Sequence, residues 1–381
     1  MYDFNLDFPN NPLLVFKDTE YKIPRGHVTD TECRPDITAV FKPNWKDENT
    51  LWPCIQLAGE QASQASKPAL KAASYLHYLL LARPDLHVAH GLLTDKKTIT
   101  FLFGIGGYGI RSFEVPWTQP DLYRLIYAFV YHLYEPGHFA DPSYVEIIPN
   151  WEEGFATYTV HGTKMEDNGT KTTIECRNFE SVYASNPFGT RTHILSNPHS
   201  KVKVDGKPLT VLKDQVCRRE TRFDEYDILA HVHSQEKVPG VVEAAYHEFI
   251  TIPLHDKRKH RIGLVQLGRP FSSITTLQEG LEVLFDTLEG TLICIGPILF
   301  AHMFAVIRYL RVERDVLHRD ISRGNVLYIK DETLPMSDAG SVPVTDTGSV
   351  CTPDAGPSEA KEVPLCFIKY LLGKRYVRNM L

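Results

Sequence analysis

The sequence lacks the features that mark a secreted, membrane-spanning or nucleic-acid-binding protein. Its seven cysteines include no CxxC pair and are odd in number, which favours reduced thiols over a disulfide framework or a zinc site. The N-terminus has neither the basic start nor the apolar core of a signal peptide. A formal net charge of -6 argues against a general electrostatic surface for nucleic acid. We therefore expect an intracellular protein, cytoplasmic or nuclear, without nucleic-acid or membrane partners.

Long hydrophobic runs are also scarce. The one long uncharged stretch, residues 291–307, is short for a membrane span and is interrupted by Gly296, Pro297 and His302. We expect it to form a core helix that breaks or kinks at the Gly-Pro pair. The content of 43% hydrophobic and 23% charged residues is typical of a globular protein, and 381 residues are enough for two domains.

The most informative segment is His318-Arg319-Asp320-Ile-Ser-Arg-Gly-Asn325, followed by the apolar residues Val-Leu. An Asp with an Asn five residues later, after His-Arg and before a strand-like run, is the catalytic-loop pattern of protein kinases. In that pattern the Asp accepts the proton of the acceptor hydroxyl, and the Asn binds a metal ion that bridges the ATP phosphates. The segment therefore predicts Asp320 as catalytic base and Asn325 as metal ligand.

A kinase also needs an ammonium group near the ATP phosphates and a carboxylate that holds it in place. Lys213 ends the strand-like run Leu209-Thr-Val-Leu-Lys213 and precedes a segment, roughly 217–233, that we expect to be helical. Glu225 is the preferred carboxylate because it shares a helix face with Leu229, and Glu220 and Asp227 are alternatives. The competing interpretation is that these are solvated surface charges.

Two further parts of a nucleotide site have weaker signals. The turn Asn186-Pro-Phe-Gly189-Thr-Arg191 lies between strand-like segments and is the best candidate for the loop over the phosphates, although it lacks the three-glycine pattern. The segment 261–270 reads as a strand that leaves into a turn, which places the interlobe hinge at Gln266 and Leu267. By contrast, Gly104 to Gly109 is expected to be a hairpin turn, because no helix follows it to bind an anion.

The remaining pattern predicts the order of elements. We expect helices over residues 67–83, 121–134 and 273–288, and strands over 98–103, 110–115, 157–160, 172–176, 192–195, 245–252 and 261–267. Residues 331–362 are rich in Ser, Thr, Asp, Gly and Pro and are expected to be a linker. This predicts an α+β chain with an N-terminal α/β region (1–165), a small lobe (166–268) and a partial helical lobe (269–381).

Several phrases together resemble the fungal-type protein kinases over roughly residues 30–381. They are Leu-Gly-Arg269-Pro-Phe-Ser-Ser, the catalytic-loop segment, Cys366-Phe-Ile-Lys-Tyr-Leu-Leu-Gly373 and the upstream Arg34-Pro-Asp36-Ile. The resemblance implies a protein-kinase-like bilobal fold, with ATP and Mg²⁺ as cofactors. It also implies phosphoryl transfer to Ser/Thr hydroxyls of a protein substrate that the sequence does not identify.

The pattern departs from a complete kinase after the catalytic loop. The second metal-binding Asp would follow the phrase at 366–373, but the sequence ends at Leu381 without one. Asp338, in Asp338-Ala-Gly340, is the alternative within the polar linker. We therefore expect a truncated large lobe, and we carry a second hypothesis: a pseudokinase or interaction module without catalysis.

A third hypothesis concerns the N-terminal region. Pro35-Asp36, then an apolar strand, then Glu60-Gln-Ala62 resembles the Asp…Glu-x-Lys metal site of restriction-nuclease-like folds. Two such acids can share a metal ion while a Lys polarises the attacking water. Position 62 is Ala, so the expected Lys is missing. A structural domain with ordinary surface acids is the preferred interpretation here.

Overall fold

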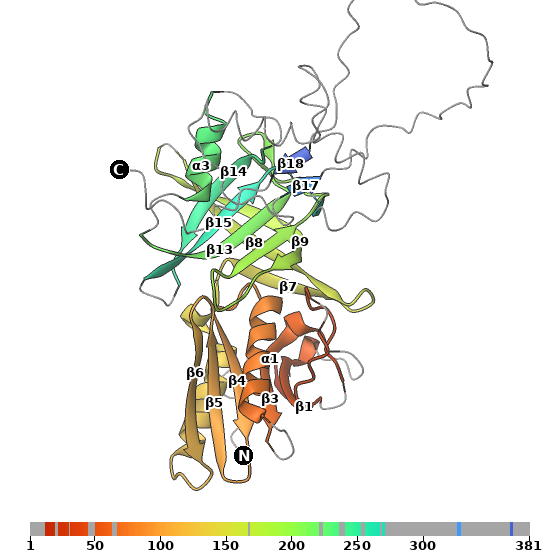
Figure 1. Ribbon diagram of the computed structural model, residues 1–381, viewed down its shortest axis with the longest axis vertical. Coiled ribbons are helices and arrows are strands. Elements are labelled where there is room, and N and C mark those ends of the chain that lie inside the picture. The colour runs from red at the N-terminus through yellow and green to blue at the C-terminus, as the bar shows by residue number, and fades with distance from the viewer. Residues whose placement is uncertain are drawn as a thin grey trace, which may run out of the picture. The chain divides into compact units, whose positions relative to one another are not determined.

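The computed structural model shows a mixed α+β protein that is rich in strand (Figure 1). It describes residues 12–19, 22–29, 31–44, 50–62, 67–166, 168–220, 224–235, 241–252, 256–266, 269–270, 326–328 and 366–368, the last three segments as backbone only. The chain divides into two units. The first comprises residues 1–226 and 243–267 and holds both large sheets, and the second comprises residues 227–242 and 268–381.

Within the described part of the chain the α-helices are α1 (Pro68–Ala82), α2 (Leu122–Tyr134) and α3 (Glu225–Val232). The first sheet has six strands in chain order: β1 (Leu14–Asp18), β2 (Ile37–Phe41), β3 (Ile55–Gln61), β4 (Val88–Thr94), β5 (Thr98–Ile105) and β6 (Gly109–Pro116). The second has seven strands, in the order β14 (Ala244–Ile250), β15 (Lys257–Leu264), β13 (Val211–Arg218), β10 (Thr192–Ser196), β9 (Lys171–Ala184), β8 (Phe155–Met165) and β7 (Tyr144–Asn150). The described residues also form a two-stranded sheet of β11 (Lys203–Val204) and β12 (Lys207–Pro208), and a three-stranded sheet in the order β16 (Arg269–Pro270), β17 (Val326–Tyr328) and β18 (Cys366–Ile368).

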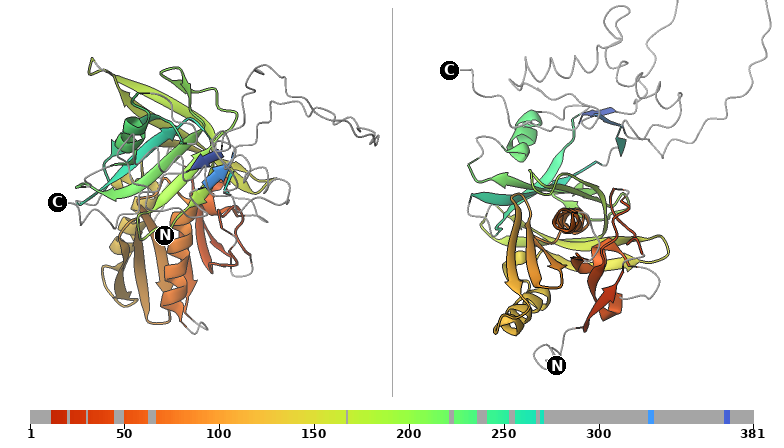
Figure 2. Two further views of the ribbon diagram at one scale, coloured as in Figure 1. Left: turned by 45° about the horizontal axis from the view of Figure 1, so that its top comes forward. Right: turned by 60° about the horizontal axis from the view of Figure 1, so that its bottom comes forward.

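Two helices cover the two faces of the six-stranded sheet. Successive strand residues point to opposite faces, so Leu57 packs with α2 while its neighbour Ala58 packs with α1. Figure 2 shows the two helices at this sheet. Helix α1 also forms the crossover between β3 and β4, the one parallel pair of the sheet, as a parallel connection requires. It begins with Pro68 and ends at Ala82, just before Pro84, where proline cannot continue a helix.

The seven-stranded sheet is antiparallel throughout, and β13 is one of its central strands. It pairs with β10 on one side and with β15 on the other. Because side chains alternate along a strand, Lys213 points to one face, whereas Leu212 and Asp214 point to the other. The face of Leu212 contributes to an apolar core that includes Tyr158 and Phe179 from β8 and β9.

That second face also holds a cluster of four buried charges, which we call the charge cluster: Asp141, Asp214, Lys259 and Arg261. Lys259 Nζ lies 2.7 Å from Asp141 Oδ2 and 2.8 Å from Asp214 Oδ2. Arg261 donates two hydrogen bonds to Asp214, at 2.7 Å from Nε and 2.8 Å from Nη2. Burial alone would raise the pKa of both aspartates, but the two cations outweigh it and hold both pKa values below the ordinary range.

A second buried cation joins the six-stranded sheet region to β10. The guanidinium of Arg191 donates hydrogen bonds to the backbone oxygens of Leu80, Arg83 and Leu86, at and beyond the C-terminal end of α1. A cation is favourable there because the last carbonyls of a helix carry partial negative charge. Glycine at position 106 leaves space for the Arg191 side chain, because a Cβ there would lie 2.5 Å from a terminal nitrogen of Arg191.

The structure confirms a mixed α+β fold and changes the bounds of several elements. The helix expected over 217–233 begins only at Glu225, because β13 continues to Arg218 in register with β15 as far as Lys257. The second sheet begins at Tyr144, ahead of the boundary expected at residue 165. Among the described helices, none is long and apolar enough to cross a membrane. The segments 273–288 and 291–307 lie outside the described residues.

The charge cluster predicts a large loss of stability for Asp214→Asn. The substitution leaves Lys259 and Arg261 buried with one carboxylate fewer, and breaking a buried ion pair costs about 3–5 kcal/mol. The free energy of unfolding from urea titration should fall by that amount. Asp121→Asn is the control, because its carboxylate is 62% exposed and should cost about 0.5 kcal/mol or less. Equal effects of the two substitutions would contradict the prediction.

Candidate functional site

The site centres on a lysine that is buried in the seven-stranded sheet. The Lys213 side chain has no exposed surface, and its Nζ donates a hydrogen bond to Oε2 of Glu225. Glu225 is the first residue of α3, and its side chain is 11% exposed. The structure thus brings these two residues together, and their role in a nucleotide site stays a prediction.

The local fold explains why this ammonium needs its carboxylate. Lys213 stands in register between Ile194 on β10 and Ile262 on β15, which are both buried. A charge among aliphatic side chains is costly unless it is paired. Of the described residues, Glu225 is the partner that meets this need. The arrangement holds one ammonium group at a fixed place, where it could bind an anionic group.

The turn that contains Gly189 connects β9 to β10, the strand beside β13. The backbone N–H of Gly189 donates to the backbone oxygen of Asn186 at 3.2 Å, and that of Phe188 donates to Asn186 Oδ1 at 3.0 Å. The backbone N–H of Gly107, in the turn between β5 and β6, donates to the oxygen of Pro187 at 2.6 Å. These amide groups are engaged within the protein, so a phosphate bound here would have to replace the bonds at 188 and 189.

The other predicted site residues are placed only in part. Gln266 lies two residues beyond β15, and its Oε1 accepts a hydrogen bond from the backbone N–H of Glu243 at 3.3 Å. Leu267, Asp320, Asn325 and the alternative Asp338 lie outside the described residues.

Backbone pairing relates the segments next to the catalytic-loop motif. Strand β17 begins directly after Asn325 and pairs antiparallel with β18, which opens the phrase Cys366 to Gly373. Strand β16, at Arg269–Pro270, pairs with the other edge of β17. Three phrases that are far apart in the sequence therefore meet in one small sheet.

A second polar cluster lies at one end of β2 and β3. Asp36 directly precedes β2, and Glu60 lies near the end of β3 with 1% of its surface exposed. Lys71 of α1 places its Nζ 2.8 Å from Glu60 Oε1 and 3.6 Å from Asp36 Oδ1. The hydroxyl of Tyr75 donates to Glu60 Oε2 at 2.8 Å. Burial raises the pKa of Glu60, although Lys71 and Tyr75 act in the opposite direction.

The sequence pattern did not identify Lys71, because the nuclease-like motif has its lysine two residues after the glutamate, where this chain has Ala62. The ammonium comes instead from the following helix. The spacing of four between Lys71 and Tyr75 was an available signal, because residues four apart lie on the same face of a helix.

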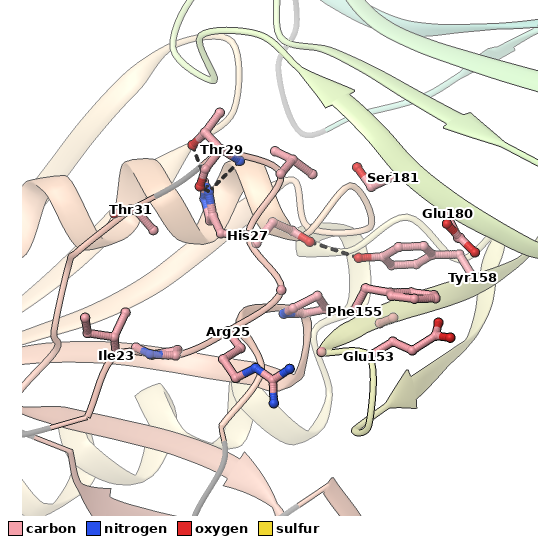
Figure 3. A pocket seen from close by; sticks show the side chains of 17 residues that line it. Ile23, Arg25, His27, Thr29, Thr31, Glu153, Phe155, Tyr158, Glu180 and Ser181 are labelled. Atoms are coloured by element: carbon pink, nitrogen blue, oxygen red, sulfur yellow. Dashed lines mark hydrogen bonds between the residues drawn. The ribbon is translucent and has the colours of Figure 1, made fainter. Parts of the chain in front are cut away.

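A pocket of about 470 Å³ lies between residues 23–29 and 31 on one side and strands β8 and β9 on the other (Figure 3). Its wall includes the charged side chains of Arg25, Glu153 and Glu180 and the ring of His27. Burial lowers the pKa of His27. The hydroxyl of Tyr158 donates to the backbone oxygen of Ala82 at 2.9 Å, which fixes one wall. Its lining includes neither Lys213 nor Glu60, and the sequence pattern did not single it out.

The Lys213–Glu225 pair predicts a measurable coupling free energy. A double-mutant cycle with Lys213→Met, Glu225→Gln and the double variant, followed by urea unfolding, should give about 1–3 kcal/mol because both groups are largely buried. The matched pair Lys207–Glu243 is separated by 2.7 Å, and its lysine is 45% exposed. Its coupling should stay below about 1 kcal/mol. A Lys213–Glu225 coupling no larger than that of the control pair would refute the structural role given to burial.

Comparison with known proteins adds no relative to this picture. No family model matches the sequence, and no curated protein matches it significantly. The functional interpretation therefore depends on the motif in the sequence and on the contacts around Lys213 and Glu225.

Proposed function

We propose that this chain is a protein-kinase-like protein that binds ATP and transfers its terminal phosphoryl group to Ser/Thr hydroxyls of a protein. The observation that carries the proposal is the buried ion pair between Lys213 and Glu225. In protein kinases a strand lysine contacts the phosphates and is held by a glutamate of the following helix. Here the lysine strand is likewise followed in the chain by the helix of its carboxylate.

The arrangement of the other strands supports the same proposal. In chain order, β9 and β10 precede the lysine strand β13, and α3, β14 and β15 follow it. These five strands and one helix are the elements expected of a kinase small lobe. The pairing of β17 with β18 also fits, because the residues after a kinase catalytic loop form a strand close to the second metal-binding segment.

In this proposal each site residue has a separate role. Lys213 would neutralise phosphate charge, and Glu225 would keep its ammonium in place. Asp320 would orient the acceptor hydroxyl and accept its proton, and Asn325 would hold Mg²⁺. Bound ATP with Mg²⁺ supplies the phosphoryl group and neutralises the charge that develops on it. The buried ammonium of Lys213 fits this role, because its positive charge would favour an anionic ligand as a second partner.

The alternative within the same fold is a pseudokinase that acts as an interaction module without catalysis. A chain that keeps the Lys213–Glu225 pair but lacks phosphotransfer would belong to this class.

The proposal predicts that Lys213→Met weakens the binding of Mg-ATP by at least about tenfold. A hydrogen bond to a charged group contributes about 1.5–3 kcal/mol, and 1.4 kcal/mol corresponds to a factor of ten. Isothermal titration calorimetry on the full chain measures the affinity, and Lys207→Met is the control because that lysine is exposed. Equal affinities of the parent and Lys213→Met for Mg-ATP would contradict the proposal.

Phosphotransfer from radiolabelled Mg-ATP to a generic protein acceptor separates the two alternatives. Activity that disappears in Asp320→Asn would support catalysis. Binding that depends on Lys213, together with no transfer by the parent chain, would favour the pseudokinase.

A second candidate function is metal-dependent phosphodiester cleavage by the N-terminal region. The observation that favours it is the convergence of Asp36, Glu60 and Lys71 at one end of β2 and β3. Two carboxylates and an ammonium are the groups that can bind a divalent cation and orient an attacking water. Asp36 Oδ1 and Glu60 Oε1 both face Lys71 Nζ, so the cation would compete with the ammonium for these oxygens. The competing interpretation is a structural ion-pair cluster.

This second function predicts cleavage of DNA or RNA by the full chain in Mg²⁺ or Mn²⁺, and its loss in both Asp36→Asn and Lys71→Met. Gel electrophoresis of the substrate measures the cleavage, and Asp121→Asn serves as an exposed-carboxylate control that should remain active. Cleavage that persists in Asp36→Asn would indicate a contaminating nuclease. The absence of cleavage in the parent would assign the cluster a structural role.

A further inference from the structure

Two histidines and an aspartate gather at the start of α3. His247 lies on β14, His260 on β15, and Asp224 directly precedes Glu225 in the chain. One ligand atom from each of these residues lies within 4.8 Å of the other two. His247 Nδ1 and His260 Nε2 are 3.3 Å apart.

The spacing of the two ring nitrogens fits a zinc-type ion. Bonds of about 2.0–2.1 Å from Zn²⁺ to histidine nitrogen, at tetrahedral angles, place two ligand nitrogens about 3.3 Å apart. Imidazole and carboxylate are ordinary ligands of this class of metal. Three protein ligands leave a fourth position for water or another donor. A simple hydrogen bond between the two rings is the competing interpretation of the same contact.

Neighbouring residues fix the positions of His247 and His260. The sheet register pairs His260 with Phe249, two residues from His247 on the same face of β14. The ring of Tyr226 stacks on His247, with ring centres 3.8 Å apart and planes 5° apart.

The charges nearby are nearly balanced. Lys213 and Arg258 act on His260 as cations, whereas Asp224 acts as an anion. Glu225 supplies a further negative charge through its pair with Lys213. A divalent cation would therefore meet two carboxylates and two side-chain cations, of which Lys213 is already paired with Glu225.

We propose that Asp224, His247 and His260 form a binding site for Zn²⁺ or a similar transition-metal ion, which fixes the first turn of α3 and thereby holds Glu225 against Lys213. Asp224 and Glu225 are adjacent in the chain, so a metal bond to Asp224 restricts the backbone that positions the Glu225 carboxylate. The effect on nucleotide binding rests on the proposed kinase-like function, whereas the metal site itself does not.

The first test is metal binding by the full chain. Co²⁺ absorption in the visible range and competition of Zn²⁺ with a chromogenic chelator report affinity without any nucleotide. Asp224→Ala and His247→Ala should each weaken binding at least about tenfold. His161→Ala is the control, because this histidine is 40% exposed and lies elsewhere in the sheet. Circular dichroism and thermal unfolding establish that each variant folds, which is why the buried His260 is left unchanged.

Hydrogen exchange of the α3 amides provides the second test. Zn²⁺ should slow exchange at residues 224–232 in the parent and in His161→Ala, but not in Asp224→Ala. Zn²⁺ binding of equal strength in all folded variants, or no binding by the parent, would overturn the site. Binding that requires Asp224 and His247 but leaves α3 exchange unchanged would overturn the role in fixing the helix.

Nucleotide binding distinguishes this inference from the proposed function. Zn²⁺ should raise the Mg-ATP affinity of the parent and leave that of Asp224→Ala unchanged. A chain that binds Zn²⁺ at this site but binds no Mg-ATP would support the metal site and overturn the kinase-like proposal. Mg-ATP binding that depends on Lys213 and is unaffected by bound Zn²⁺ would overturn the regulatory part of this inference.

Discussion

The structure depends on the mutual neutralisation of the buried charges Asp141, Asp214, Lys259 and Arg261. Two acids and two bases, each at most 4% exposed, form these ion pairs, and those of Asp141 join segments more than a hundred residues apart. Ions of this kind are tolerated in a protein interior only when their partners are in place. Because Asp141 precedes the seven-stranded sheet while the other three lie on β13 and β15, the cluster fixes the chain that enters this sheet to its central strands.

Two adjacent residues of β13, Lys213 and Asp214, carry charges with different roles. Asp214 belongs to the charge cluster on one face, and Lys213 reaches Glu225 on the other. The alternation of side chains along a strand separates the two groups, so the ammonium of Lys213 is paired with its own carboxylate and lies apart from the charge cluster. A strand that is anchored so firmly on one face presents a well-defined lysine on the other, which is the condition that the proposed phosphate contact requires.

The sequence predicted part of the local order around this site: Glu225 lies in a helix with Leu229 four residues on, and the turn containing Gly189 connects two β segments. It was wrong to end the strand at Lys213, which is the third residue of β13 (Val211–Arg218). It could not predict contacts that depend on long-range pairing, such as Arg261 with Asp141 or Lys71 with Glu60, because one sequence does not reveal which distant charges meet. The late start of α3 was missed for a related reason: one sequence does not reveal that Arg218 pairs with Lys257, which extends β13 to residue 218. The predictions for Asp320 and Asn325 concern residues outside the described part of the chain.

The hydrogen bond from Gly107 to Pro187 ties the turn between β9 and β10 to the turn between β5 and β6, and Lys257 donates to the backbone oxygen of the same glycine. A movement of the turn between β9 and β10 could not remain local. Any displacement of Pro187 must either break its hydrogen bond to Gly107 or move the end of the β5–β6 hairpin with it. The six-stranded sheet therefore limits how far the turn between β9 and β10 can move.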